Sequence, residues 1–154
     1  CGTGQIAHLL AGRVQRVIAV DNSPAMLKAA KKRMGDRPDV SLLRGELEAL
    51  PIDDGTCDAA LLVLVLSYLP DPPAALKELA RILKPAGRAV IVDLQPHDRD
   101  DFRREMGQTL LGFGPDVLRE MLRPAGFGRI DITPLPPEPN VKGPALFLAT
   151  AEKA

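Results

Sequence analysis

Short apolar runs alternate with amphipathic segments along the chain, and this alternation constrains the fold more than any other feature of the sequence. Residues 16–21 form a short and almost wholly apolar run, and residues 58–66 are apolar enough for a strand that is buried on both faces of a sheet. Between such runs, apolar residues recur at helical spacing, for example in residues 76–83. The regular exchange of strands and helices predicts an α/β fold with a mainly parallel sheet.

The individual elements follow from this pattern and from the turn residues. We expect helices over residues 6–10, 24–34, 72–83, 98–111 and 115–126, with a turn at 84–87. We expect strands over residues 16–21, 40–44, 58–66, 88–93, 129–133 and 145–151. The last two strands flank a proline-rich connection and predict an antiparallel ending to the sheet. No repeat or linker interrupts the pattern, so residues 1–154 are expected to form one domain.

Composition excludes several classes of protein. The 20 basic and 20 acidic residues give a formal net charge of zero, so the charge expected of a nucleic-acid-binding segment is absent. No apolar run approaches the roughly 20 residues of a membrane-spanning helix, and no membrane partner is expected. The two cysteines, Cys1 and Cys57, lie far apart, which argues against a zinc site or a disulfide framework. We expect a cytoplasmic protein without a bound metal.

A glycine loop at the start of the chain predicts a ligand. Gly2 and Gly4, followed by Ala7, match the dinucleotide-binding fingerprint, in which glycines let the backbone approach a ligand closely. Asp21 ends the next strand, where its carboxylate could accept hydrogen bonds from both ribose hydroxyls. An adenosine-containing ligand is therefore expected, either a nicotinamide cofactor or S-adenosylmethionine. The alternative is that the glycines only join two elements and that Asp21 only begins a turn.

Motifs further along the chain distinguish between these two cofactors. Residues 1–5 (CGTGQ) and 17–27 (VIAVDNSPAML) resemble the first two motifs of class I S-adenosylmethionine-dependent methyltransferases. Residues 45–52 and 58–63 resemble the third and fourth motifs, and residues 81–88 resemble the turn before the fifth strand. The resemblance is to type 11 and ubiquinone- or menaquinone-biosynthesis-like enzymes. It implies a Rossmann-like sheet, S-adenosylmethionine as cofactor, and a domain that is truncated at its N terminus, with the first strand missing from the chain.

The resemblance also assigns residues to the methionine and ribose parts of the cofactor. Gly2, Thr3 and Gly4 would pack against these parts, and Asp21 would bind the ribose hydroxyls. Val63 would lie near the methionine end.

Four further residues are expected at the adenine. Ser23 and Met26 would lie beside the ring, although Met26 could equally belong to the helix core. Glu46 stands where many relatives have an aspartate that binds the adenine amino group, and the backbone N–H of Leu47 would complete that contact.

The acceptor site is expected after the strands at 58–66 and 88–93, because ligands in open α/β sheets bind at the carboxyl ends of strands. Methyl transfer is an in-line displacement, so the protein must mainly orient the nucleophile and exclude water. His97, next to Asp98, is a candidate base, and Tyr68 is a second candidate catalytic residue. The alternative for His97 is a solvated loop residue. We expect a small-molecule methyl acceptor.

A narrower resemblance concerns residues 93–98, 103–107, 111–113 and 126–127. They are similar to bacterial methyltransferase domains that follow an ArsR-type winged-helix domain in one chain. This similarity implies a missing N-terminal domain, through which a homodimer could form. It also implies that residues 98–114 form a lid over the acceptor. The alternative for these residues is an ordinary connecting helix. Two other functions stay open, namely a regulatory domain that senses S-adenosylmethionine and a nicotinamide-dependent oxidoreductase.

Overall fold

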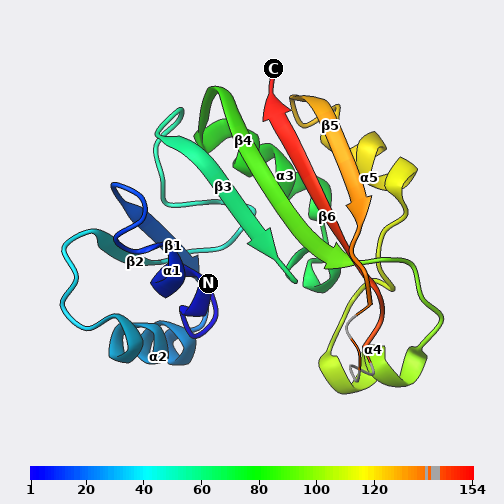
Figure 1. Ribbon diagram of the computed structural model, residues 1–154, viewed down its shortest axis with the longest axis horizontal. Coiled ribbons are helices and arrows are strands. Elements are labelled where there is room, and N and C mark those ends of the chain that lie inside the picture. The colour runs from blue at the N-terminus through cyan, green and yellow to red at the C-terminus, as the bar shows by residue number, and fades with distance from the viewer. Residues whose placement is uncertain (138, 140–142) are drawn as a thin grey trace. The chain divides into compact units, whose positions relative to one another are not determined.

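The computed structural model describes residues 1–137, 139 and 143–154. The chain forms two compact units, an N-terminal unit over Cys1–Ile52 and a C-terminal unit over Asp53–Ala154. Each unit is described by itself, and its elements can be followed by label and colour in Figure 1.

The N-terminal unit is a two-stranded parallel sheet with two helices. Its elements in chain order are α1 (Gln5–Leu10), β1 (Val17–Asp21), α2 (Pro24–Met34) and β2 (Val40–Arg44). β1 and β2 pair in parallel from Val17 opposite Val40 to Asp21 opposite Arg44. The small core beneath them consists of Ala7, Val17, Ala19 and Met34, with Leu10, Val40 and Leu42 packed against it.

Local sequence determines where α2 begins and ends. The Ser23 side chain accepts a hydrogen bond from the Met26 N–H, and Pro24 occupies the first helical position, where its missing N–H is not needed. At the other end, Gly35 has a positive φ of 64° and its N–H donates to the Lys31 carbonyl. The start of α2 is joined to the carboxyl end of β1, because the Ser23 N–H donates to Asp21 Oδ1 at 2.9 Å.

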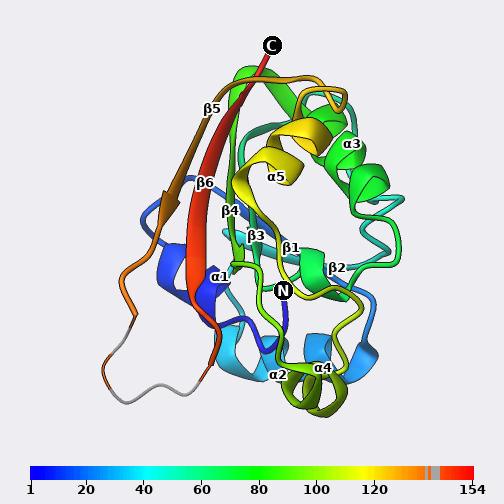
Figure 2. The same ribbon diagram turned by 90° about the vertical axis from the view of Figure 1, so that its right-hand side faces the viewer.

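The C-terminal unit is a four-stranded mixed sheet in the order β3-β4-β6-β5. Its strands are β3 (Cys57–Val63), β4 (Leu83–Leu94), β5 (Phe127–Pro134) and β6 (Leu146–Lys153), and its helices are η1 (Leu66–Tyr68), α3 (Pro72–Ile82), α4 (Asp100–Met106) and α5 (Pro115–Leu122). β3 pairs with β4 in parallel, whereas β6 pairs with both β4 and β5 in antiparallel fashion. Figure 2 shows α3 and α5 on the same face of this sheet. Their buried residues, among them Leu76, Leu118 and Leu122, form the core with Ile91 of β4.

The α/β class and the antiparallel ending are confirmed, but several predicted boundaries are wrong. The strand predicted over 58–66 ends at Val63, because the backbone of Leu64 turns into the left-handed region at a φ of 54°. The predicted turn at 84–87 belongs to β4, where the register with β3 shifts between Cys57 and Ala59.

The predicted helices after β4 are also shorter than expected. The helix predicted over 98–111 is limited to α4, which Gly107 follows with a φ of 70°. The helix predicted over 115–126 ends at Leu122, two residues before Pro124. Of the proline-rich connection 134–139, residue 138 lies outside the described residues.

Candidate functional site

The two glycines of the N-terminal loop have different structural roles. Both have a positive φ, 56° at Gly2 and 76° at Gly4. A Cβ at Gly4 would lie 2.9 Å from the Ala30 Cβ of α2, so close packing of the loop on this helix requires a glycine there. A Cβ at Gly2 would have nothing within 4 Å. The protein leaves open space at Gly2, as expected where a backbone must approach a ligand.

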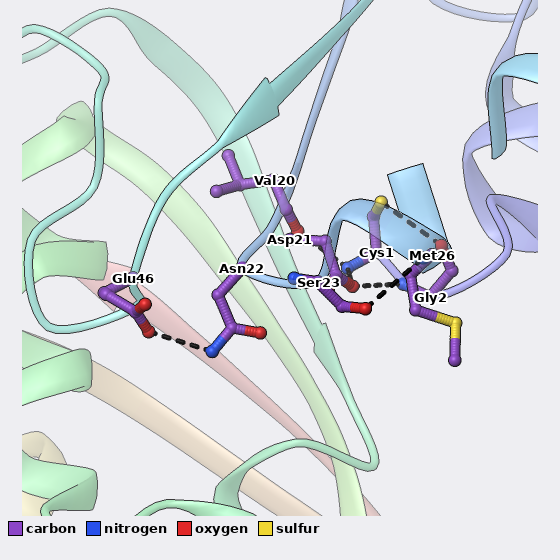
Figure 3. Close-up of polar contacts among 8 residues, drawn as sticks. All are labelled: Cys1, Gly2, Val20, Asp21, Asn22, Ser23, Met26 and Glu46. Carbon is purple, nitrogen blue, oxygen red and sulfur yellow. Dashed lines mark hydrogen bonds and ion pairs between the residues drawn. The ribbon is translucent and has the colours of Figure 1, made fainter. Parts of the chain in front are cut away.

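Asp21 ties the glycine loop to the carboxyl end of β1. Its Oδ2 accepts hydrogen bonds from the Gly2 N–H at 2.7 Å and from the Cys1 amino group at 2.9 Å, and its Oδ1 accepts one from the Ser23 N–H at 2.9 Å (Figure 3). Burial alone would raise the pKa of Asp21, but these donors outweigh it and hold the pKa below its ordinary value. A carboxylate accepts about four hydrogen bonds, so one position at Oδ1 stays open for a ligand hydroxyl.

The structure settles one alternative for the residues at the start of α2. Ser23 is the helix cap, and its backbone N–H also binds Asp21. The Met26 side chain is 42% exposed, so it is not a core residue of α2. Thr3 is exposed in the glycine loop, and its carbonyl accepts a hydrogen bond from Arg33 Nε at 3.0 Å.

Glu46 lies in the turn after β2 and contacts Asn22, a residue that the sequence analysis did not single out. Asn22 Nδ2 donates to Glu46 Oε2 at 2.9 Å (Figure 3). Leu47 is half-buried next to Glu46. The parallel register of β1 and β2 brings the turns after Asp21 and Arg44 together. The only sequence signal for Asn22 was its position directly after a predicted ligand residue.

In the C-terminal unit, a buried carboxylate that sequence reasoning missed organises the end of β3. Asp93 of β4 is fully buried, and its Oδ2 accepts hydrogen bonds from the N–H groups of Val65 at 3.1 Å and Ser67 at 3.4 Å. Its Oδ1 accepts one from the Leu94 N–H at 2.8 Å. Val63, the last residue of β3, is half-buried directly before this turn. In the sequence, Asp93 ends an apolar run and begins the 93–98 stretch of the narrower resemblance, but neither feature indicated its hydrogen bonds.

Tyr68 and His97 contact the same segment, residues 107–113. Thr109 donates from its hydroxyl to the Tyr68 carbonyl at 3.0 Å, and the N–H groups of Thr109 and Leu110 donate to the Ser67 carbonyl. The His97 N–H donates to the Leu111 carbonyl at 3.1 Å. The tertiary structure therefore brings both predicted catalytic residues into contact with one segment, residues 107–113. Tyr68 is 36% exposed.

The His97 ring has a local contact. Its Nδ1 accepts a hydrogen bond from the Arg99 N–H at 3.3 Å. This contact orients the ring within the loop after β4.

Two other features involve the segment of residues 107–113 and its neighbours. Ser67 Oγ and Gln108 Oε1 are buried without a hydrogen-bond partner in the part of the chain that the structure describes. Phe113 and Pro96 help to line a mainly apolar cavity of about 50 Å³, together with Gln95, Pro115, Leu118, Ile132, Pro134 and Phe147. A larger hollow of about 200 Å³ in the N-terminal unit lies at the end of α2, away from Asp21, and is lined by Lys31, Met34, Gly35, Arg37, Val40 and Leu42.

Two features are absent from residues 1–137, 139 and 143–154. No group of three or more histidine, cysteine, aspartate or glutamate side chains is arranged to hold a metal ion. None of the helices there has the length and apolar character needed to cross a membrane.

Comparison with known proteins gives a consistent set of similarities. A family model described as a methyltransferase domain matches residues 1–91. An uncharacterized methyltransferase of Mycobacterium tuberculosis is 34% identical over 119 residues, which cover 77% of this chain and 47% of the relative. The demethylmenaquinone methyltransferase of Renibacterium salmoninarum is 34% identical over 116 residues, covering 75% of this chain and 48% of the relative. The chain thus spans less than half the length of these relatives.

The fold also matches solved structures. The crystal structure of a SAM-dependent methyltransferase from Thermotoga maritima superposes with a TM-score of 0.75 at 26% identity, over 99% of this chain and 79% of that one.

Proposed function

Since the chain belongs to the methyltransferase domain family, of the class I S-adenosylmethionine-dependent type, we propose that it transfers a methyl group from S-adenosylmethionine to a small-molecule acceptor. The observation that carries this proposal is the pairing of open space at Gly2 with a carboxylate, Asp21, that keeps one acceptor position for a hydroxyl. A nicotinamide cofactor would use the same pair, but nothing in the family match favours it.

The residues of the N-terminal unit fit this cofactor. We assign Gly2, Thr3 and Gly4 to its methionine and ribose parts and Asp21 to a ribose hydroxyl. Met26, which is 42% exposed, offers an apolar surface for the adenine ring, and Ser23 holds the start of the same helix. Glu46 and Leu47 follow in the turn after β2, where a carboxylate and a backbone N–H are available to the base.

In the C-terminal unit, the chain's own groups would orient the acceptor. Bound S-adenosylmethionine supplies a methyl group on a positively charged sulfur, which needs a nucleophile in line and little else. Asp93 fixes the turn after Val63 through the backbone N–H groups of Val65 and Ser67, and this turn carries Tyr68. His97, next to Asp98, stays the candidate base for the acceptor, and the segment of residues 107–113 would limit the entry of water.

The acceptor that we propose has an apolar part. The cavity beside Pro96 and Phe113 is small and mainly apolar, and one relative's name describes methylation of demethylmenaquinone, a quinone. We therefore propose an aromatic or otherwise partly apolar acceptor. Ser67 Oγ, in η1, and Gln108 Oε1, in the segment that contacts it, are buried and have no partner among the described residues, which would favour an acceptor that also carries a polar group.

Binding and turnover experiments test the proposal separately. Full-length protein is titrated with S-adenosylmethionine, S-adenosylhomocysteine and NADH, and binding of the first two but not of NADH is expected. Release of S-adenosylhomocysteine is then followed with a panel of quinols, phenols and amines. Tight binding of NADH alone would refute the proposal, whereas tight cofactor binding with no turnover across a broad panel would indicate a sensor of S-adenosylmethionine.

A further inference from the structure

Asn22 and Glu46 form a side-chain pair at the carboxyl ends of β1 and β2 (Figure 3). The two residues are 24 positions apart in the sequence, and the Asn22 Nδ2 to Glu46 Oε2 distance is 2.9 Å. The sheet keeps them close, because Asp21 pairs with Arg44 and the Gly45 N–H donates to the Asp21 carbonyl at 3.2 Å. Gly45 in turn has no room for a side chain, since its Cβ would lie 2.5 Å from Pro51 Cδ. The turn that carries Glu46 is thus fixed on both sides.

The hydrogen bond restrains a side chain that would otherwise be free. Both residues are exposed, and an exposed glutamate samples many rotamers, which costs conformational entropy when a ligand orders it. Asn22 donates to Oε2, so Oε1 keeps its capacity as an acceptor. The pair lies directly after Asp21, which binds three donors of its own. A ligand held at Asp21 therefore meets a carboxylate oxygen that is already restrained.

A restrained carboxylate distinguishes bases by the group that faces it. The exocyclic amino group of adenine donates a hydrogen bond to a carboxylate, whereas hypoxanthine carries a carbonyl oxygen at the same position and would present a lone pair to it. A site that is built to accept a hydrogen bond disfavours an analogue that lacks the donor.

We propose that Asn22 is a positioning residue that holds Glu46 for the exocyclic amino group of adenine, and that this pair makes the site selective for adenine over hypoxanthine. The inference rests on the proposed function, because it takes S-adenosylmethionine as the ligand, and it adds the residue that determines base selectivity.

The experiment compares two ligands that differ only at this position of the base. Dissociation constants of S-adenosylhomocysteine and S-inosylhomocysteine are measured calorimetrically with the full-length protein. The wild type is expected to prefer the adenine ligand by about 10- to 100-fold, the range for a hydrogen bond to a charged group. Glu46→Ala abolishes the preference, Asn22→Leu reduces it several-fold through weaker binding of the adenine ligand, and Asn22→Gln, which retains an amide donor, restores part of it.

Ser41→Ala is the matched control. It removes another exposed hydrogen bond between side chains of the same unit, from Arg16 Nη2 to Ser41 Oγ at 3.2 Å, and should leave the preference unchanged. A wild-type preference in Asn22→Leu, or equal weakening of both ligands, would overturn the role of Asn22. Tight binding of both ligands by the wild type without a preference would refute the inference alone. Failure to bind either ligand would refute the proposed function and the inference with it.

Discussion

Asp21 accepts hydrogen bonds from two segments of the N-terminal unit. It receives the N–H groups of Gly2 and Ser23, one from the glycine loop and one from the start of α2. One side chain therefore orders the two segments that are assigned to the cofactor. The Cys1 amino group, together with the N–H groups of Ser23 and Gly2, holds the pKa of Asp21 below the ordinary value of 3.8 in spite of its burial.

Asp21→Asn tests this role. Asparagine has one acceptor oxygen instead of two, so the variant should lose part of the loop's hydrogen bonds and bind S-adenosylhomocysteine at least 10-fold more weakly in calorimetry. The lowered pKa means that the carboxylate stabilises the folded protein above pH 3.8 and that this contribution disappears as the pH falls through the lowered value. The difference in unfolding free energy between the wild type and the Asp21→Asn variant should therefore be constant at neutral pH and shrink below pH 3.8. A difference that grows on acidification would contradict this assignment.

At the scale of elements, the glycine loop and α2 form one packed junction. Gly4 contacts Ala30 closely, whereas Gly2 faces open space, although both have a positive φ. The motif in the sequence treats the two glycines alike, and only the packing of the loop on the helix separates a structural glycine from one that leaves room for a ligand.

A matched pair of substitutions tests this separation. Gly4→Ala should cost about 2 kcal/mol or more of unfolding free energy, because the new methyl group overlaps Ala30 and the backbone conformation is strained. Gly2→Ala should cost only the backbone strain, about 1 kcal/mol, but should weaken cofactor binding more than Gly4→Ala does relative to its effect on stability. Chemical denaturation and calorimetry measure both quantities. Equal stability losses for the two variants would contradict the assignment.

A second junction links β4 to the turn after β3 through Asp93. Parallel pairing places Val63 opposite Val92, so the next residue of β4 reaches the N–H groups of Val65 and Ser67. Leu64 lies in this turn with a φ of 54°, an unusual conformation for a leucine that the surrounding contacts must maintain.

Asp93→Ala should therefore destabilise the protein strongly. It leaves three backbone N–H groups without their acceptor in a buried region, and we expect a loss of about 3 kcal/mol or more in chemical denaturation. Asp131→Ala, at an exposed position of β5, is the control and should change stability by no more than about 0.5 kcal/mol. A similar small loss at both positions would show that Asp93 does not organise the turn.

At the scale of the whole molecule, the predicted site residues are divided between the two units. The glycine loop, Asp21, Ser23, Met26, Glu46 and Leu47, all assigned to the cofactor, belong to the N-terminal unit, whereas Val63 and the candidate catalytic residues Tyr68 and His97 belong to the C-terminal unit. A cofactor bound at the glycine loop should stabilise the N-terminal unit.

Hydrogen exchange tests this expectation. S-adenosylhomocysteine at about 100 times its dissociation constant should add about 2.7 kcal/mol to the unfolding free energy. It should slow exchange of the amides of Gly2, Gly4, Ser23 and Leu47 in the N-terminal unit. Unchanged exchange at these four amides in the presence of bound ligand would contradict the assignment of the glycine loop to the cofactor.

The sequence alone determined the class of fold, the order of most elements and the family. Apolar periodicity and turn residues are local, so they predicted β2 correctly over Val40–Arg44 and α2 from its cap at Ser23. They were less accurate where tertiary contacts override them, as at Leu64, where the turn held by Asp93 ends β3 earlier than its apolar run does.

Only the tertiary structure decided which side chains work together. The Asn22–Glu46 pair and the contacts of Asp93 with Val65 and Ser67 join residues 24 to 28 positions apart. Such contacts depend on the register of parallel strands, and the spacing of residues along the chain does not specify that register. Packing between distant segments also decides which side chains reach solvent and which segments meet. It explains why Met26 is exposed and why Tyr68 and His97 both contact residues 107–113.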